Sequence, residues 1–203
     1  MQKSLTKNSI YNVIYTIANI LFPFATSIYV SRILLPAGVG KVASAQNIVS
    51  YFVTLAALGL PSYGVREFAK VREKKYERNK LFTELLLVNI ISTTLAVVGF
   101  IGLVVVNEGF SGQWALYAAC GLSIAFNYLN IDWMYQGLEE YGYITGRSLL
   151  IKGLSLLALF LFVKTREDYV IYALISSLAT GGNYVFNVLN ARKYVALDFS
   201  RIE

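Results

Sequence analysis

Three charged side chains lie inside or at the edge of long apolar stretches of this chain: Asp132, Arg147 and Lys152. A charge within a membrane is costly and by default marks a functional site. At 1.5 Å of helix rise per residue, Asp132 and Lys152 lie about 10 Å inside the same membrane face. We therefore predict that Asp132 pairs with Lys152 or with Arg147 across a helical hairpin. The alternative is that these side chains extend to the interface without pairing.

Small polar residues recur at steps of three and four in the apolar stretches, which places them on single helix faces. Polar groups facing lipid tails are costly when unpaired, so these faces contact other helices or water. One interpretation is hydrogen bonding between helices, worth about 0.6 kcal/mol per bond. We favour a hydrophilic lumen, because asparagine is bulkier than the residues of tight helix contacts. The asparagines predicted to line this lumen are Asn12, Asn19, Asn47, Asn127, Asn130, Asn183 and Asn187.

Two cations and a proline add to this candidate lumen. Arg32 could offer a fork of donors to a phosphate group, or anchor its helix at the interface. Lys152 is the second candidate cation. Pro23 removes a backbone hydrogen bond within its helix and bends it, so it is either a gating hinge or a packing bend. We assign Asp132 and Arg147 to structure or gating.

Catalysis is not favoured by the residue types present. The chain has no histidine, so it offers no imidazole base or imidazole metal ligand. It shows no paired carboxylates and no glycine-rich phosphate loop, and its single cysteine, Cys120, lies in an apolar run. We therefore expect no enzymatic activity, no metal site and no cofactor.

The elements that must position these residues are transmembrane helices. The chain of 203 residues is 56% hydrophobic and only 15% charged, against about 25% charged in soluble domains. Uncharged runs are long enough to cross the roughly 30 Å hydrocarbon core of a bilayer as helices. We predict an all-α integral membrane protein, a single bundle of six transmembrane helices over residues 1–203. The expected spans are approximately 9–33, 42–65, 83–106, 114–136, 146–163 and 169–191.

Positive charge indicates the orientation of these spans. Residues 66–80 hold seven of the eighteen lysines and arginines, directly after an uncharged run. With the N-terminus inside, thirteen positive charges lie in cytoplasmic segments and four in outer segments, which fits the positive-inside rule. We predict a cytoplasmic-membrane protein with both termini in the cytoplasm. The net charge of +6 thus reflects topology and not nucleic-acid binding. Contact of residues 66–80 with anionic lipid head groups is a secondary possibility.

Several runs resemble the signatures of a known family. They are IYVSRILLPAGVG at 28–40, SAQNIVSYF at 44–52, LGLPSYGVRE at 58–67, DWMYQGLEE at 132–140, ITGRS at 144–148 and GGN at 181–183. These runs are spread over the whole chain. They resemble the bacterial polysaccharide flippases of the O-antigen and capsule type. Those proteins belong to a superfamily that also includes multidrug exporters and the peptidoglycan lipid flippase.

The resemblance implies a mechanism. Such proteins move undecaprenyl-diphosphate-linked oligosaccharide repeat units from the cytoplasmic to the outer leaflet for surface polysaccharide biosynthesis. The sugar head group passes through a polar, often cationic cavity between two lobes of six helices each. This chain is similar to the N-terminal lobe only, and the second lobe is absent from it. A second lobe, a homodimer partner or polysaccharide assembly proteins are the implied protein partners.

Three other functions stay open. A multidrug or small-molecule exporter of the same superfamily would need acidic residues deep in the membrane for ion coupling, and here only the near-interfacial Asp132 is available. An inactive or regulatory half-protein could associate with a full-length flippase. A membrane-embedded transferase is the least supported, because the residues for catalysis are missing.

Overall fold

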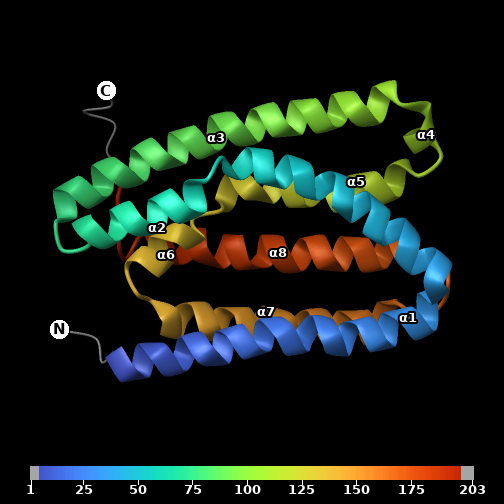
Figure 1. Cartoon of the computed structure of the whole chain (residues 1–203), viewed down its shortest axis with the longest axis horizontal. Coiled ribbons are helices and arrows are strands. Elements are labelled where there is room, and N and C mark those ends of the chain that lie inside the picture. Colours follow the sequence, from blue (N-terminus) through green and yellow to red (C-terminus); the bar gives the residue numbers. More distant parts are fainter. Residues whose placement is uncertain (1–4, 198–203) are drawn as a thin grey trace.

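The computed structural model describes residues 5–197, and it places them in helices and short connections without a β-strand (Figure 1). The protein is therefore all-α, as predicted. The elements in chain order are α1 (Leu5–Ala57), α2 (Leu60–Val71), α3 (Lys75–Val106), α4 (Glu108–Ser111), α5 (Trp114–Phe126), the 3₁₀ turn η1 (Asn127–Leu129), α6 (Asp132–Gly137), α7 (Tyr141–Phe162) and α8 (Tyr169–Ala191).

The first helix doubles back on itself. Leu35 leaves the helical conformation, with φ 59° and ψ 171°, directly before Pro36. A residue that precedes proline is disfavoured in the α conformation, so the turn has a local cause. Figure 1 shows α1 running along the bundle and returning at a sharp angle. We call residues 5–34 the first arm and residues 36–57 the second arm. Pro23 lies within the first arm, and its role as a hinge stays a prediction.

Two of the expected spans are interrupted helices. The helix predicted over residues 42–65 ends at Ala57, because Leu58 and Gly59 adopt positive φ angles of 45° and 72°. Glycine adopts this conformation without steric cost, and the separate helix α2 starts immediately after it. The helix predicted over residues 114–136 is likewise divided into α5, η1 and α6.

The helices form one elongated bundle with α8 in its middle (Figure 1). α8 packs most extensively against α5, while α1 contacts α3 through its second arm and α7 through its first. A side chain at Gly181 would collide with the ring of Phe126, which explains how closely α8 approaches α5. We call the extremity that holds α2 and α6 the α2 end, and the extremity that holds the turn at Leu35 the α4 end. Both ends of the described chain lie at the α2 end.

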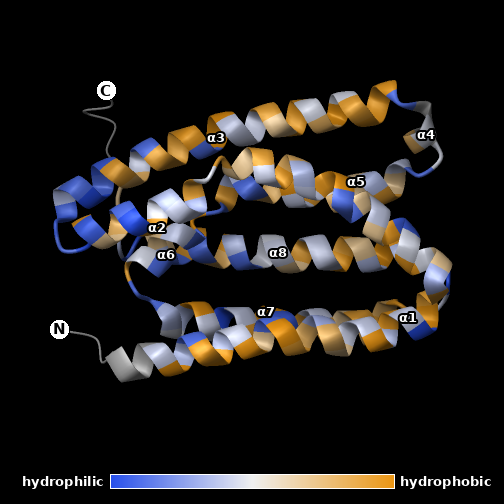
Figure 2. Ribbon diagram, in the orientation of Figure 1, coloured by the Kyte–Doolittle hydropathy of each residue, from blue (hydrophilic) through white to orange (hydrophobic). Residues whose placement is uncertain are grey.

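The bundle has the composition of a membrane protein. Among residues 5–197, three helical stretches are long and apolar enough to cross a membrane: Ser9–Val71, Lys75–Val106 and Tyr141–Phe162. α3 is hydrophobic along most of its length, whereas its first turns are hydrophilic and α2 carries both hydrophilic and hydrophobic residues (Figure 2). α8 is long enough to span but carries several polar residues. The prediction of six spans stays a prediction.

Candidate functional site

An ion pair lies inside the bundle near the α2 end. Arg147 of α7 donates from Nη1 to Asp132 Oδ1 over 3.1 Å, and Asp132 is the first residue of α6. The Asn187 side chain of α8 accepts from Arg147 and donates to the same carboxylate oxygen. The predicted pairing of Asp132 is therefore with Arg147 and not with Lys152. The arrangement ties α6, α7 and α8 together, and we call these three side chains the buried ion centre.

Arg147 and Asn187 of this centre are buried, whereas the Asp132 side chain is 28% exposed. The Arg147 side chain is 3% exposed, and its Nη1 also donates to the Asn183 carbonyl over 3.2 Å. Its Nε is buried and makes no hydrogen bond within residues 5–197. Tyr135 donates its hydroxyl to the Asn187 carbonyl over 2.6 Å. Since Arg147 is enclosed and already paired, it is not available to bind a substrate anion.

A network of amides supports the interruption between α5 and α6. Asn89 Nδ2 of α3 donates to the Asn127 carbonyl over 2.7 Å, and Asn127 Nδ2 donates back to Asn89 Oδ1 over 3.0 Å. Asn127 also donates to Thr93 Oγ1, and Asn130 donates to Asn127 Oδ1. Irregular backbone at membrane depth needs such internal partners. Asn127 is 1% exposed, so its geometry matches the helix-contact interpretation better than the lumen.

Close glycine contacts fix α6 against α2. A Cβ atom at Gly64 would lie 2.9 Å from the Trp133 ring, and one at Gly137 would lie 2.5 Å from Phe68 Cβ. Trp133 and Phe68 are fully buried and pack edge to face. This contact holds α6, and with it Asp132, in a fixed position.

Lys152 occupies a different environment from Arg147. Its Nζ donates to Asn19 Oδ1 of the first arm over 2.5 Å, and it lies 5.7 Å from the centre of the Phe22 ring. The residue is only partly buried and has no acidic partner among residues 5–197. Two residues that were predicted for the lumen are thus brought together, from α1 and α7.

The other predicted lumen residues divide into exposed and buried ones. Asn12, Arg32 and Asn47 are exposed on the two arms of α1, as is Pro23. Asn130 and Asn183 are partly buried, whereas Asn187 is completely buried. Among the predicted lumen residues, the exposed asparagines therefore lie on α1, whereas Asn187 of α8 is buried inside the bundle. We use the name open polar face for the accessible polar residues Asn12, Asn19, Asn47 and Lys152, which come from both arms of α1 and from α7; among them, Asn19 and Lys152 are in contact.

Sequence reasoning missed the polar residues of α3. Asn89, Ser92 and Thr93 are all buried, and Ser92 donates to the Ala56 carbonyl over 2.6 Å. Their spacing of three and four residues, continued by Ala96, was the available signal for a helix-contact face.

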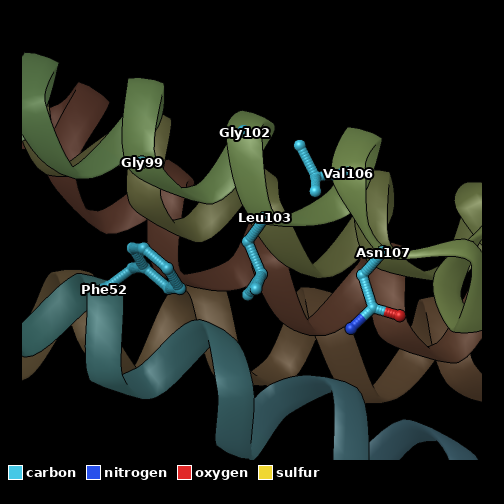
Figure 3. Close-up of a pocket in the computed structure, with 6 residues that line it drawn as sticks. All are labelled: Phe52, Gly99, Gly102, Leu103, Val106 and Asn107. Atoms are coloured by element: carbon cyan, nitrogen blue, oxygen red, sulfur yellow. The ribbon is translucent and has the colours of Figure 1, made fainter.

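A surface groove of about 660 Å³ lies between the second arm of α1 and the end of α3 (Figure 3). Phe52 lines it from α1, and Gly99, Leu103 and Asn107 are among the residues that line it from the α3 side. It is mostly apolar and lies apart from the buried ion centre. Its position on an outward, apolar part of α3 fits contact with lipid tails.

Comparison with known proteins adds the family. The chain is 22% identical over 176 residues to a protein of Escherichia coli strain K12 named "Putative O-antigen transporter", covering 87% of this chain and 42% of that protein. It is 27% identical over 157 residues to a Shigella dysenteriae protein of the same name, covering 75% of this chain and 38% of that protein. The chain thus spans less than half the length of these curated relatives. No solved structure matches it.

The family model described as "Polysaccharide biosynthesis protein" matches residues 5–199. This match runs through every helix that carries the buried ion centre and the open polar face. The protein therefore belongs to the polysaccharide biosynthesis protein family.

Proposed function

We propose that this chain forms one lobe of a flippase that moves lipid-linked oligosaccharide repeat units across the bacterial cytoplasmic membrane. The family and the names of its relatives support a transporter for polysaccharide assembly. The length of those relatives, more than twice the matched region, supports a second lobe. No enzymatic step belongs to this proposal.

The observation that carries the proposal is the open polar face. A sugar head group presents hydroxyls that need hydrogen-bond partners once it leaves water, and exposed Asn12, Asn19 and Asn47 offer amide donors and acceptors. A lipid diphosphate is negatively charged, and the Lys152 ammonium supplies a point charge without a competing carboxylate nearby. The second lobe would close the opposite side of this passage.

The buried ion centre has a supporting role in this proposal. It fixes the mutual positions of α6, α7 and α8, so that the lobe moves as one body against its partner. The orientation with the α2 end in the cytoplasm follows from the distribution of lysines and arginines and belongs to the proposal.

Complementation tests the proposed function. The chain is expressed in a bacterial strain without its own flippase for a compatible repeat unit, alone and together with the second lobe of a full-length relative. We expect surface polysaccharide to return only when both lobes are present. Rescue by the chain alone would mean that one lobe suffices, for instance as a homodimer. No rescue by several second lobes matched to the repeat unit, with membrane insertion confirmed, would contradict the proposal.

A further inference from the structure

A helical hairpin extends from the α2 end of the bundle. It consists of α2 and the first turns of α3, residues 60–84, and we call it the basic hairpin. α3 has 32 residues and is therefore about 48 Å long, which exceeds the roughly 30 Å hydrocarbon core. Its first ten residues contain all the charges of the helix, so this part lies beyond the hydrocarbon. Figure 2 shows the hydrophilic colouring of this end.

The apolar face of α2 is already occupied. Leu60, Gly64 and Phe68 are buried, and they pack on α6 and its neighbours. α2 therefore does not insert this face into lipid tails. The opposite face points outward, where the side chains of Arg66 and Lys70 are 67% and 61% exposed.

The basic hairpin carries seven lysines and arginines against four glutamates, so its net charge is +3; Glu73 is one of the exposed glutamates, and Arg72 pairs with Glu139. Glu67 contacts both Arg66 and Lys70, at 3.0 and 2.9 Å, and so neutralises only one of them. Lys74 pairs with Glu77 at the tip of the hairpin. The adjacent Lys75 is exposed and makes no ion pair within residues 5–197.

Further cations lie beside the hairpin. The Ala196 backbone N–H donates to Asn79 Oδ1 over 3.1 Å, which holds the segment after α8 against α3. Arg192 and Lys193, at the end of α8, are exposed in this neighbourhood. The positive surface thus continues from the hairpin onto a second element of the α2 end.

Exposed tyrosines accompany these cations. Tyr63 of α2 is 47% exposed and Tyr76 of α3 is 53% exposed. The Arg66 guanidinium lies 5.7 Å from the centre of the Tyr63 ring. Tyrosine is enriched at membrane interfaces because its ring is apolar and its hydroxyl is polar. Basic side chains interleaved with exposed tyrosines fit a charged lipid surface better than a free anion in water.

We propose that the basic hairpin docks on anionic phospholipid head groups of the inner leaflet. Anionic lipids give that leaflet a negative surface potential, and each nearby lysine or arginine gains about 1 kcal/mol, or about fivefold in affinity. Since Trp133 and Gly137 join α2 tightly to α6, head-group contact would hold the whole α2 end at a set depth. The inference rests on the proposed function only for its orientation, with the α2 end in the cytoplasm.

Hydrogen–deuterium exchange of the full chain in lipid nanodiscs tests this docking. Nanodiscs of phosphatidylcholine are compared with nanodiscs that also contain phosphatidylglycerol. We expect amides of residues 62–80 to exchange at least about fivefold more slowly with phosphatidylglycerol, and the difference to vanish at about 1 M salt, where screening acts within about 3 Å. Amides of α8 within the bundle serve as an internal reference and stay unchanged.

A matched pair of variants gives the specificity control. Lys70→Gln, Lys74→Gln and Lys75→Gln together should abolish the protection by phosphatidylglycerol. Lys41→Gln, Lys164→Gln and Arg166→Gln together remove equal charge at exposed positions far from the hairpin and should preserve it. Loss of protection in both triple variants would mean that net charge alone acts, and would overturn the proposal.

A third nanodisc composition distinguishes phospholipid from the transported lipid as the anion that the hairpin binds. An isoprenoid diphosphate added to phosphatidylcholine tests the transported lipid itself. Protection with the isoprenoid diphosphate but not with phosphatidylglycerol would overturn docking on phospholipid and assign the hairpin to substrate capture. No protection with either lipid would also overturn it. Because exchange is measured without transport, these results are independent of the complementation experiment.

Discussion

Two cations on α7 lie five residues apart and have opposite environments. Arg147 is enclosed with Asp132 and Asn187, and its guanidinium reaches acceptors on two other helices. Lys152 is partly exposed and has a single hydrogen-bond acceptor, the amide of Asn19. Burying an unpaired charge costs several kcal/mol, so Arg147 is retained only with its partners, whereas Lys152 keeps a charge that faces open space. Charge inside the bundle thus serves architecture at Arg147, whereas at Lys152 the proposed role is attraction of the ligand.

Replacing Arg147 should cause the largest loss of stability, far larger than replacing Lys152. Arg147→Met leaves the buried Asn187 side chain and the Asp132 carboxylate, which is 28% exposed, without their main partner. We expect a loss of about 3 kcal/mol in the free energy of unfolding, the lower end for a broken buried pair, because water reaches part of Asp132. Thermal unfolding of the chain in detergent measures the effect. Lys152→Met is the matched control and should cost less than about 1 kcal/mol. Equal losses in the two variants would contradict the distinction between the two cations.

The amide network gives the next largest effect on stability. Asn127→Ala removes the amide that donates to Asn89 Oδ1 and leaves this buried oxygen without its donor, at an expected cost of about 1–3 kcal/mol. Asn47→Ala changes an exposed side chain of the same type and should alter stability by no more than about 0.5 kcal/mol. The same unfolding assay compares them. A destabilisation by Asn47→Ala that matched that of Asn127→Ala would place Asn47 in a helix contact and remove it from the open polar face.

Lys152 should affect transport without affecting folding. Lys152→Gln removes the charge but keeps a polar side chain, and we expect about tenfold less surface polysaccharide in cells that also supply the second lobe, equivalent to about 1.4 kcal/mol. Lys152→Arg retains the charge and should retain most of the activity. Immunoblots of membranes verify equal insertion. Full polymer levels with the glutamine variant would exclude an essential cation here.

Arg32 should give the smallest change. It is exposed on the first arm, close to the turn at Leu35. Arg32→Ala should lower surface polysaccharide about threefold, because an exposed cation in water attracts an anion only weakly, by less than about 1 kcal/mol. The purified variant should unfold at the temperature of the parent protein. If polymer levels stay unchanged for Arg32→Ala and Lys152→Ala alike, neither cation has a role in transport.

The pairing of Asp132 could be predicted from sequence because hairpin geometry is local. Two helices joined by a short turn place residues near the turn at similar depth, and this limited the partner to Arg147 or Lys152. The third member of the centre, Asn187, lies on α8. The regular spacing of polar residues along α8 places Asn187 on one face of that helix but does not show which other helix this face contacts. The choice between lumen and helix contact therefore needed the structure.

Interruptions within helices were the feature that was hardest to predict from the sequence. The turn at Leu35, directly before Pro36, falls between two predicted spans, residues 9–33 and 42–65. Gly59 falls inside the second of these spans, where the uncharged run suggested a continuous helix. The interruption at Asn130 has no proline or glycine at all. It depends on the Asn89 amide of α3, which donates to the Asn127 carbonyl, and on the Asn130 amide, which donates to Asn127 Oδ1; the contact with α3 is a tertiary effect.

Cysteine accessibility tests most directly the central claim that the Lys152 side of α7 faces an aqueous passage. In a chain whose single cysteine is replaced by Cys120→Ser, Lys152→Cys is compared with Ser155→Cys, a buried position one turn further on the same helix. Both variants are assembled with the second lobe in cells and treated with a charged thiol reagent that lipid excludes. We predict modification of Lys152→Cys and none of Ser155→Cys. If Lys152→Cys and Asn47→Cys both stay unmodified, the open polar face contacts lipid or protein and not water. That result would contradict the account.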